Sequence, residues 1–301
     1  MDAKRFALLF GATSLVGRHL AARLSESGFE GVCLSRRKGR DRYEAPPGFA
    51  WQTLSAEDRL SVPASAVLFS LAPIPALPAL LRRIAGADRL IALSTSSVYF
   101  KAQSSDPDER RLVQTLEQAE TEVRSLCTDR AIAWTIFRPT LVYDPGHDRN
   151  ITAIAAFARR FGVFPVAWPG TGRRQPVHAD DVAQAMAAAA GVPGANGAIF
   201  DLPGGETLTY RTMVRRTIRS TGRRPFLLYL PLGLARPAFR AWRAVTGAEY
   251  STAALERMNM DLTVDPAPVQ QALGITGRPF RPEPPLPGDA ARGRPTQAGR
   301  R

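Results

Sequence analysis

Apolar runs of strand length alternate with helical patterns through the first half of the chain. The predicted strands are 5–12, 31–35, 49–54, 66–72, 89–95 and 131–143, and the predicted helices are 14–27 and 106–127. Because these strands are almost uniformly apolar, both of their faces should be buried, as in a parallel sheet with helices on each side. The pattern predicts an α/β fold built on a doubly wound parallel sheet.

After about residue 144 the rhythm changes to short strands and longer helices. The helices predicted here are 209–221, 232–246, 251–260 and 266–273. We expect a smaller C-terminal lobe, built mainly from 144–178 and 205–280, over the edge of the sheet where ligands bind, with 179–191 returning to the sheet. Residues 1–280 would form the folded body. From Arg281 onward apolar residues are too few for a core, so 281–301 is predicted to be a disordered tail.

The composition is that of a soluble globular protein: of 301 residues, 45% are hydrophobic and 22% charged. The net charge is +13. The arginines are nevertheless scattered and interleaved with acids, apart from short clusters at 36–42 and in the last ten residues. The sequence has no zinc-ligand spacing, so no metal site is predicted. Because the arginines are scattered and do not alternate with aromatic residues, no nucleic-acid partner is predicted either.

Two segments raise the question of a membrane. Residues 60–81 carry no charge and are long enough to span a bilayer, but prolines interrupt them, so a strand, a loop and a helix are predicted instead. Arg236, Arg240 and Arg243 share one stripe of a predicted helix, a pattern that suits a membrane surface. Its aromatic residues lie toward the other side, so we expect them to pack into the lobe.

The cysteines bear on location. Cys33 and Cys127 lie in a predicted strand and a predicted helix, with no partner motif, which suits a reducing compartment. No signal peptide fits before the first predicted strand. A cytoplasmic location is therefore expected.

Residues 11–17, GATSLVG, have the outline of a phosphate-binding turn between the first strand and the first helix. Such a turn is an anion site, because the first N–H groups of a helix lack internal partners and the helix dipole favours negative charge. Gly11 would allow the sharp exit from the strand, and Gly17 would let the helix pack close to the sheet. The alternative is a capped helix without a ligand.

Ser14 stands at the central position of this turn, where a third glycine is expected. Its hydroxyl can cap the helix and donate to a phosphate oxygen, although serine costs stability if the position needs a positive φ. We therefore expect a dinucleotide to bind here and at the end of the fourth predicted strand. The expected residues are Gly11, Thr13, Ser14, Leu15, Val16, Gly17, Leu71 and Ala72.

The end of the second strand bears on which dinucleotide binds. An acid there would hold the ribose hydroxyl of NAD, whereas an arginine suits the 2′-phosphate of NADP. The strand ends with Ser35, Arg36 and Arg37 and no acid. These residues favour NADP, with NAD still possible and a solvated basic loop as the alternative.

Four segments together resemble a known family: GATSLVG at 11–17, STSSVY at 94–99, RPTLVYDPG at 138–146 and RRQPVHADDVAQA at 173–185. In order and spacing they are similar to the extended and atypical short-chain dehydrogenase/reductases, the NAD-dependent epimerase/dehydratase superfamily. The resemblance covers roughly 5–280. It implies a Rossmann-type domain, a nicotinamide dinucleotide and a small C-terminal substrate lobe.

The resemblance also implies catalytic positions. A hydroxyl residue after the fifth strand, here Thr95, helps to orient the substrate in that family. The family's acid/base is a Tyr followed four residues later by a Lys, whose charge eases ionisation of the phenol. No lysine of this chain has a Tyr four residues earlier, and the expected helix positions hold Leu112 and Leu116. Tyr99 is the remaining nearby phenol and our candidate acid, although the family position is usually structural.

Other positions follow from the same resemblance. Arg174 matches the position that contacts the diphosphate in nucleotide-sugar enzymes, with a surface ion pair as the alternative. Asn150 lies on the loop after the sixth strand, where a substrate should approach. His178 is expected to be structural. Asp180 and Asp181 look like the N-cap and dipole partners of the helix that follows.

Two functions fit these expectations. In the first, the protein is an NADP(H)-binding oxidoreductase or epimerase-like enzyme acting on a small molecule, for example a nucleotide sugar, through a non-standard active site. In the second, it is a non-catalytic relative that uses the dinucleotide as a structural ligand or a redox sensor.

Overall fold

The computed structural model describes residues 5–35, 44–55, 58–233 and 253–282. Its centre is a seven-stranded sheet in the order β13-β8-β7-β5-β1-β2-β3, in which every pairing is parallel. These strands are β1 (Arg5–Phe10), β2 (Phe29–Ser35), β3 (Phe49–Thr53), β5 (Val67–Ser70), β7 (Arg89–Leu93), β8 (Ala133–Pro139) and β13 (Ala198–Leu202). The predicted doubly wound sheet is confirmed.

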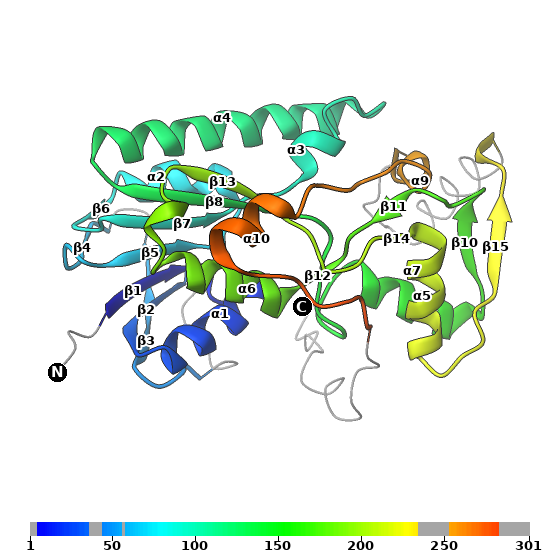
Figure 1. The fold of residues 1–301 in the computed structure, drawn as a ribbon, viewed down its shortest axis with the longest axis horizontal. Coiled ribbons are helices and arrows are strands. Elements are labelled where there is room, and N and C mark those ends of the chain that lie inside the picture. Colours follow the sequence, from blue (N-terminus) through cyan, green and yellow to red (C-terminus); the bar gives the residue numbers. More distant parts are fainter. Residues whose placement is uncertain (1–4, 36–43, 56–57, 234–252, 283–301) are drawn as a thin grey trace, which may run out of the picture.

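Helices cover both faces of the sheet (Figure 1). α1 (Leu15–Glu26) and α6 (Ala179–Ala189) pack on one face, and α2 (Leu77–Leu81) and α4 (Pro107–Asp129) pack on the other. β1 shows why the strands are so apolar: Ala7 and Leu9 belong to the first of these cores, and Leu8 and Phe10 to the second. A strand buried on both faces has no polar side to display.

The predicted strand 131–143 is two strands in the structure. β8 ends at Pro139, and β9 (Val142–Tyr143) pairs separately with β12 (Val177–His178). A proline cannot donate a hydrogen bond to the ladder, so it marks the point where the chain leaves the sheet.

Short elements complete the sheet domain. β4 (Leu60–Ser61) pairs with β6 (Ile84–Ala85), and η1 (Ile74–Ala76) precedes α2. The uncharged stretch 60–81 thus contains two strands, a 3₁₀ turn and a short helix. Within the described residues, none of the helices has the length and apolar character needed to cross a bilayer. α3 (Ser97–Phe100) follows β7, and η2 (Pro193–Ala195) precedes β13.

The lobe lies beyond the carboxyl ends of the strands, to the right in Figure 1. It contains α5 (Ile151–Phe161), β10 (Phe164–Ala167), β11 (Arg173–Arg174), β14 (Leu208–Thr209), α7 (Tyr210–Ser220), β15 (Leu227–Leu230) and α9 (Ala253–Arg257). α5 and α7 share a core that includes Tyr143, Met213 and Phe280. Most of the predicted helix 232–246, with its arginine stripe, lies outside the described residues.

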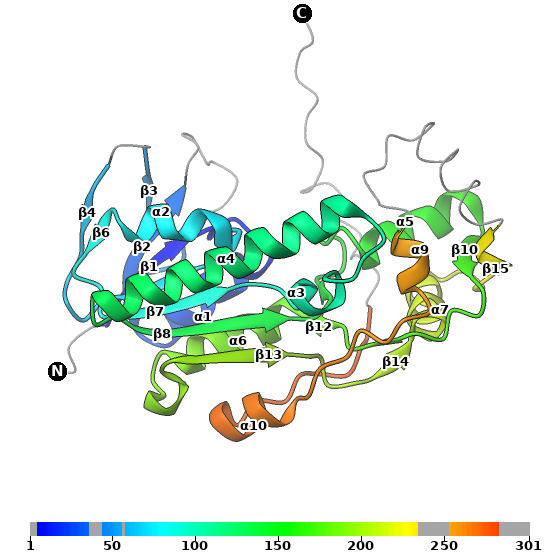
Figure 2. The ribbon, with the colours of Figure 1, turned by 90° about the horizontal axis from the view of Figure 1, so that it is seen from above.

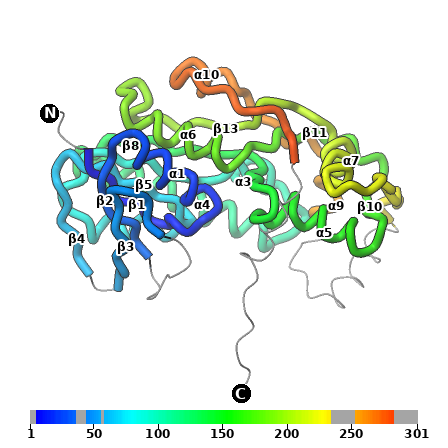
Figure 3. The backbone as a smooth tube through the Cα atoms, turned by 90° about the horizontal axis from the view of Figure 1, so that it is seen from below, coloured from blue at the N-terminus to red at the C-terminus, as the bar shows by residue number. Residues whose placement is uncertain are grey.

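The end of the described chain returns to the sheet domain. α10 (Ala267–Leu273) runs beside α6 and β13, as Figures 2 and 3 show from opposite sides. Val269 and Ile275 belong to the same core as α1 and α6. This part of the stretch 205–280 therefore packs on the Rossmann-type domain rather than inside the lobe.

An ion-pair network ties α1 to α6. Arg23 donates two hydrogen bonds to the Asp180 carboxylate, at 2.6 and 2.7 Å, and Arg278 donates to both Asp180 and Asp181 at 2.7 Å. The hydrogen bond from Arg23 holds the pKa of Asp180 well below its usual range. The network joins the first helix, the sixth helix and the C-terminal segment.

Replacing Asp180 should therefore destabilise the protein in a pH-dependent way. For Asp180→Asn we expect a loss of about 1–3 kcal/mol at pH 7, since hydrogen bonds to charged groups are at stake. Because the pKa is lowered in the folded state, the wild-type advantage is complete above the ordinary Asp pKa of about 3.9 and fades as the pH falls below it. Denaturant unfolding at neutral and acidic pH measures this difference. Asp129→Asn, at an exposed position, is the control; an equal effect of both variants would contradict the prediction.

Candidate functional site

The site begins at the end of β1, where the order of the strands reverses: β2 and β3 lie on one side of β1, and β5 lies on the other. Ligands of open α/β sheets bind at such a switch point, beyond the carboxyl ends of the strands. Gly11 has a φ of +87°, and a Cβ there would lie 2.8 Å from the backbone nitrogen of Ala72. The turn thus requires glycine both for its backbone conformation and for its close approach to the residues after β5.

Gly17 fulfils a second close approach. A Cβ at this position would lie 2.5 Å from the carbonyl oxygen of Gly11 and 2.6 Å from that of Ala12. Without a side chain, the first turn of α1 can pack directly against the turn that leaves β1. The two glycines form a cradle of bare backbone of the kind that a pyrophosphate needs.

Ser14 is the N-cap of α1. Its side-chain oxygen accepts a hydrogen bond from the Gly17 N–H at 3.1 Å, and its φ is −70°. The position does not need a positive φ, so serine carries no backbone cost here. Thr13 is exposed beside it, whereas Val16 is buried in the core.

The charge at the start of α1 also suits an anion. α1 has no acidic residue in its first turn, whereas α6 has Asp180 and Asp181 there. The positive end of the α1 dipole is therefore not offset by a carboxylate of its own first turn. Leu71 and Ala72 lie opposite, with the Leu71 N–H donating to the Phe10 carbonyl at 2.8 Å.

Of the residues predicted for the 2′ position of the ribose, Ser35 is the last residue of β2. It lies next to β3, where its carbonyl accepts a hydrogen bond from Leu54 N–H at 2.8 Å. Arg36 and Arg37 lie outside the described residues.

The other half of the site lies after β7. Thr95 Oγ1 accepts a hydrogen bond from the Ser97 N–H at 3.1 Å, and so it helps to start α3. The neighbouring Ser94 hydroxyl donates to Glu120 on α4. Tyr99, on α3, has 47% of its surface exposed. The predicted catalytic residues thus share the edge of the sheet next to the strand ends.

Tyr99 belongs to a polar cluster that the sequence analysis did not foresee. Arg138, near the end of β8, donates through Nη1 to the Tyr99 hydroxyl and through Nη2 and Nε to Glu120. Asp201, beside Arg138 in the register of β13, is a neighbour of both side chains. The available signal was a charged residue near the end of each of two apolar strands, at Arg138 and Asp201.

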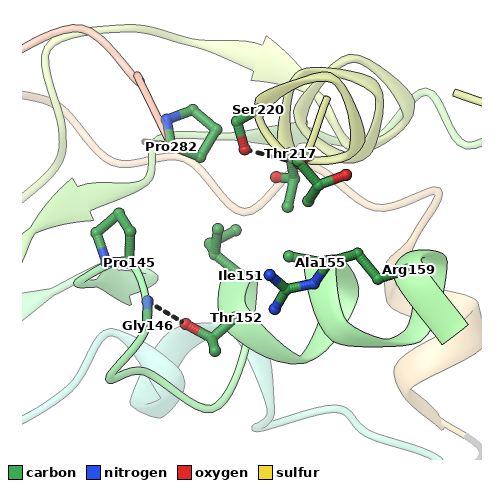
Figure 4. A pocket seen from close by; sticks show the side chains of 10 residues that line it. Pro145, Gly146, Ile151, Thr152, Ala155, Arg159, Thr217, Ser220 and Pro282 are labelled. Atoms are coloured by element: carbon green, nitrogen blue, oxygen red, sulfur yellow. Dashed lines mark hydrogen bonds between the residues drawn. The ribbon is translucent and has the colours of Figure 1, made fainter. Parts of the chain in front are cut away.

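A loop joins β9 to α5. Asp148 is buried and accepts hydrogen bonds from three successive backbone N–H groups, those of Asn150, Ile151 and Thr152. Asn150 itself is exposed and makes no side-chain cap bond, so its amide faces solvent. Figure 4 shows a cavity next to this loop, between α5 and α7, of about 20 Å³. Pro145 and Ile151 are among the residues that line it, and it has room for one water molecule.

The histidines of the chain gather around Asp144, directly after β9. His19 Nε2 lies 3.1 Å and His147 Nδ1 3.7 Å from Asp144 Oδ2. The ring of His178 packs against those of His19 and Tyr143. These contacts fix the start of the loop against α1.

His178 also corrects the expected helix start. An aspartate, Asp180 or Asp181, was expected to be the N-cap, but His178 is the N-cap, and its Nδ1 accepts a hydrogen bond from the Asp180 N–H at 3.1 Å. The two aspartates lie in the first turn, as expected of dipole partners. Burial lowers the pKa of His178, in keeping with a neutral ring that caps through Nδ1. The residues that the structure describes hold no cluster of His, Cys, Asp and Glu suited to a metal ion.

Comparison with known proteins identifies the family. The model of the NAD dependent epimerase/dehydratase family matches residues 76–201. A curated relative, the (4-alkanoyl-5-oxo-2,5-dihydrofuran-3-yl)methyl phosphate reductase of Streptomyces griseus subsp. griseus, is 30% identical over 291 residues, which span 91% of this chain and 94% of the relative. The chain belongs to the NAD-dependent epimerase/dehydratase family. Membership supports a nicotinamide dinucleotide as the cofactor, and the Gly11–Gly17 cradle fits one.

Solved structures share the fold. The epimerase Mth375 of Methanothermobacter thermautotrophicus aligns with a TM-score of 0.68 at 15% identity, covering 93% of this chain and 89% of that chain. The UDP-glucuronic acid 4-epimerase of Bacillus cereus, solved with UDP-glucuronic acid and NAD, aligns with a TM-score of 0.66 at 16% identity over 91% and 95%. MoeE5, solved with the same two ligands, gives 0.63 at 21% over 92% and 95%. At these identities the likeness concerns the fold alone.

On α4 the chain departs from the arrangement that the family resemblance implies. Counting back from Glu120, the Tyr is expected two turns earlier, at Leu112, and the Lys one turn earlier, at Leu116. Leu116 is buried in the core beneath α4, and Leu112 is 43% exposed. Neither side chain can exchange a proton or carry a charge.

Arg174 is buried, with 5% of its surface exposed. Its guanidinium donates to the backbone carbonyls of Arg173 and Met260, both at 2.7 Å, and to that of Arg257. It also lies over the Tyr210 ring, with 5.4 Å between the guanidinium carbon and the ring centroid. Burial lowers its pKa to about 10. The geometry gives Arg174 the task of joining β11 to the segment after α9.

The cradle makes a direct prediction about Gly17. In Gly17→Ala the new methyl group would meet the Gly11 and Ala12 carbonyls, so the turn must shift away from α1. We expect a loss of about 1–3 kcal/mol in unfolding free energy and at least tenfold weaker dinucleotide binding. Thermal unfolding and a fluorescence titration measure the two effects.

Gly194→Ala is the matched control, because a Cβ there would meet nothing within 4 Å. It should leave both quantities unchanged. If Gly17→Ala bound the dinucleotide as tightly as the control does, the cradle would not be the phosphate site.

Proposed function

We propose that this protein is an NADP(H)-dependent reductase of a small molecule whose reacting bond is conjugated to a carbonyl group. The observation that carries the proposal is the cradle of Gly11 and Gly17 at the switch point, with an uncompensated helix N-terminus beside it. NADP is proposed over NAD because Arg36 and Arg37 follow β2 and no acid does. A bound nicotinamide supplies a hydride; the chain must provide for the proton.

The leucines on α4 support a conjugated substrate. Reducing a simple ketone puts negative charge on one oxygen, which calls for a strong, well-placed proton donor such as the family's Tyr and Lys. A substrate conjugated to carbonyl groups spreads the negative charge over several atoms, so it needs a less strong proton donor. The name of the Streptomyces griseus relative describes such a molecule, a phosphorylated lactone that also carries an alkanoyl group. Leu112 and Leu116 are compatible with this chemistry.

A nucleotide sugar is supported less well. The expected diphosphate contact, Arg174, is buried and donates three hydrogen bonds to carbonyls of its own lobe. Thr95 and the exposed Asn150 remain our candidates for substrate contacts at the two sides of the sheet edge. Both cysteines are buried free thiols, in keeping with the cytoplasmic location that we propose.

Cofactor preference is tested by titrating the protein with NADPH and with NADH, followed by nicotinamide fluorescence. We expect Arg36→Ala to weaken NADPH binding about 10–100-fold, the equivalent of about 1.5–3 kcal/mol for hydrogen bonds to a charged phosphate, and to leave NADH binding unchanged. Arg223→Ala, at an exposed lobe position, is the control. Equal losses for NADPH and NADH would argue against a 2′-phosphate contact.

The reaction is tested by NADPH oxidation in the presence of a (4-alkanoyl-5-oxo-2,5-dihydrofuran-3-yl)methyl phosphate, with UDP-glucuronic acid as the contrasting substrate. We expect turnover of the first and none of the second. Tight NADPH binding without turnover of either would support the alternative, a non-catalytic protein that senses the dinucleotide.

A further inference from the structure

We propose that Tyr99 and Arg138 form a replacement for the missing dyad, in which Tyr99 is the proton donor and Arg138 is the positioning residue that holds its oxygen. The inference rests on the proposed reductase function and names the groups that complete it. It differs from the family arrangement in origin: the phenol comes from α3 and the cation from β8, and neither comes from α4.

The contact between the two side chains has the geometry of a working pair. Arg138 Nη1 donates to the Tyr99 hydroxyl oxygen, and the guanidinium carbon lies 5.0 Å from the centre of the Tyr99 ring. Tyr99 is half exposed, and α3, which carries it, follows the carboxyl end of β7, at the same edge of the sheet as the cofactor cradle after β1. A proton donor needs both a fixed oxygen and access for the substrate.

Arg138 is itself held in place. The Glu120 side chain is 3% exposed and that of Arg138 is 14% exposed, and Nε and Nη2 of Arg138 donate to the two oxygens of Glu120. Burial lowers the pKa of Arg138, but the hydrogen bond and the charge of Glu120 outweigh burial, and the net pKa is raised. The cation is therefore permanent. Glu120 already balances its charge, so the further bond to Tyr99 is not needed to stabilise a buried arginine.

Asp201 gives the phenol a resting acceptor. Burial raises the pKa of Asp201, while the charge of Arg138 and a hydrogen bond from Tyr99 act in the opposite direction. Asp201 Oδ1 is buried and has no hydrogen-bond partner among the described residues. Because Arg138 donates to the Tyr99 oxygen, the Tyr99 O–H can turn toward Asp201 at rest and toward a substrate oxygen in the complex.

A hydride supplied by a bound dinucleotide, which would be oxidised, would add to the conjugated carbon, and the resulting charge would collect on the carbonyl oxygen of the substrate. The Tyr99 O–H bond breaks and its proton passes to that oxygen, which leaves a phenolate beside the Arg138 cation. Water returns a proton to the phenolate, and the enol product relaxes to the saturated carbonyl compound.

The test measures kcat and KM for NADPH-dependent reduction of the lactone phosphate named above. In Tyr99→Phe we expect kcat to fall about 10²–10⁴-fold with little change in KM or in NADPH affinity, because only the proton donor is lost. In Arg138→Lys, which keeps the charge but loses the fork, we expect an intermediate kcat. A solvent deuterium isotope effect on kcat should accompany the proton transfer in the wild-type protein.

The lobe offers a matched control, since Arg215 Nη2 donates to the Tyr229 hydroxyl at 3.1 Å in the same kind of pair. Tyr229→Phe should leave kcat unchanged. A Tyr99→Phe variant within about threefold of the wild-type kcat would overturn the pair while leaving the reductase function standing. A wild-type protein that binds NADPH but does not reduce the probe would contradict the proposed function, and the pair with it.

Discussion

Two backbone segments approach each other at the end of β1 more closely than any side chain allows. Gly11 touches the chain after β5, and Gly17 touches the carbonyls of Gly11 and Ala12. This contact fixes where α1 begins, and α1 in turn packs along its length against α6. Because α6 begins at His178, which contacts His19 on α1 and Tyr143 before the loop, the same contact also orients the entrance to the lobe. The position of the whole ligand edge depends on two missing Cβ atoms.

The helix N-termini of this protein differ in the charge that they carry. The N-termini of α4 and α6 carry acids of their own, and the N-terminus of α5 is capped by Asp148. Of these four helices, only α1 is capped by a neutral hydroxyl, that of Ser14, and has no acid in its first turn. Since a carboxylate at a helix N-terminus offsets the dipole, the arrangement leaves positive potential at α1, where the cradle can receive phosphate oxygens.

Local patterns revealed the sheet and the cradle, because apolar runs and glycine spacing are properties of short segments. They did not reveal the polar cluster, because Arg138, Glu120 and Asp201 meet only when strands distant in the chain are paired. The same limit applies to Arg174, whose carbonyl partners include Arg257 and Met260. At the start of α6 the sequence suggested an aspartate as the N-cap, but the His178 ring can also accept the hydrogen bond from the Asp180 N–H. The His178 ring is held there by its contacts with His19 and Tyr143, which are distant in the chain.

The Tyr99–Arg138 pair that we propose differs from a Tyr–Lys dyad on α4 in how its positive charge is held. A lysine on a helix carries a compact charge on a flexible stem, whereas Arg138 is a planar fork fixed on a strand by two bonds to Glu120. Because the guanidinium is fixed, the position of Tyr99 decides whether the two side chains meet. The hydrogen bond from the Ser97 N–H to Thr95 helps to start α3, and α3 places the Tyr99 hydroxyl next to Arg138. A preorganised charge of this kind costs little rearrangement during the reaction. In the reaction that we propose, the carbonyl oxygen of the substrate would therefore have to approach the fixed Tyr99–Arg138 pair.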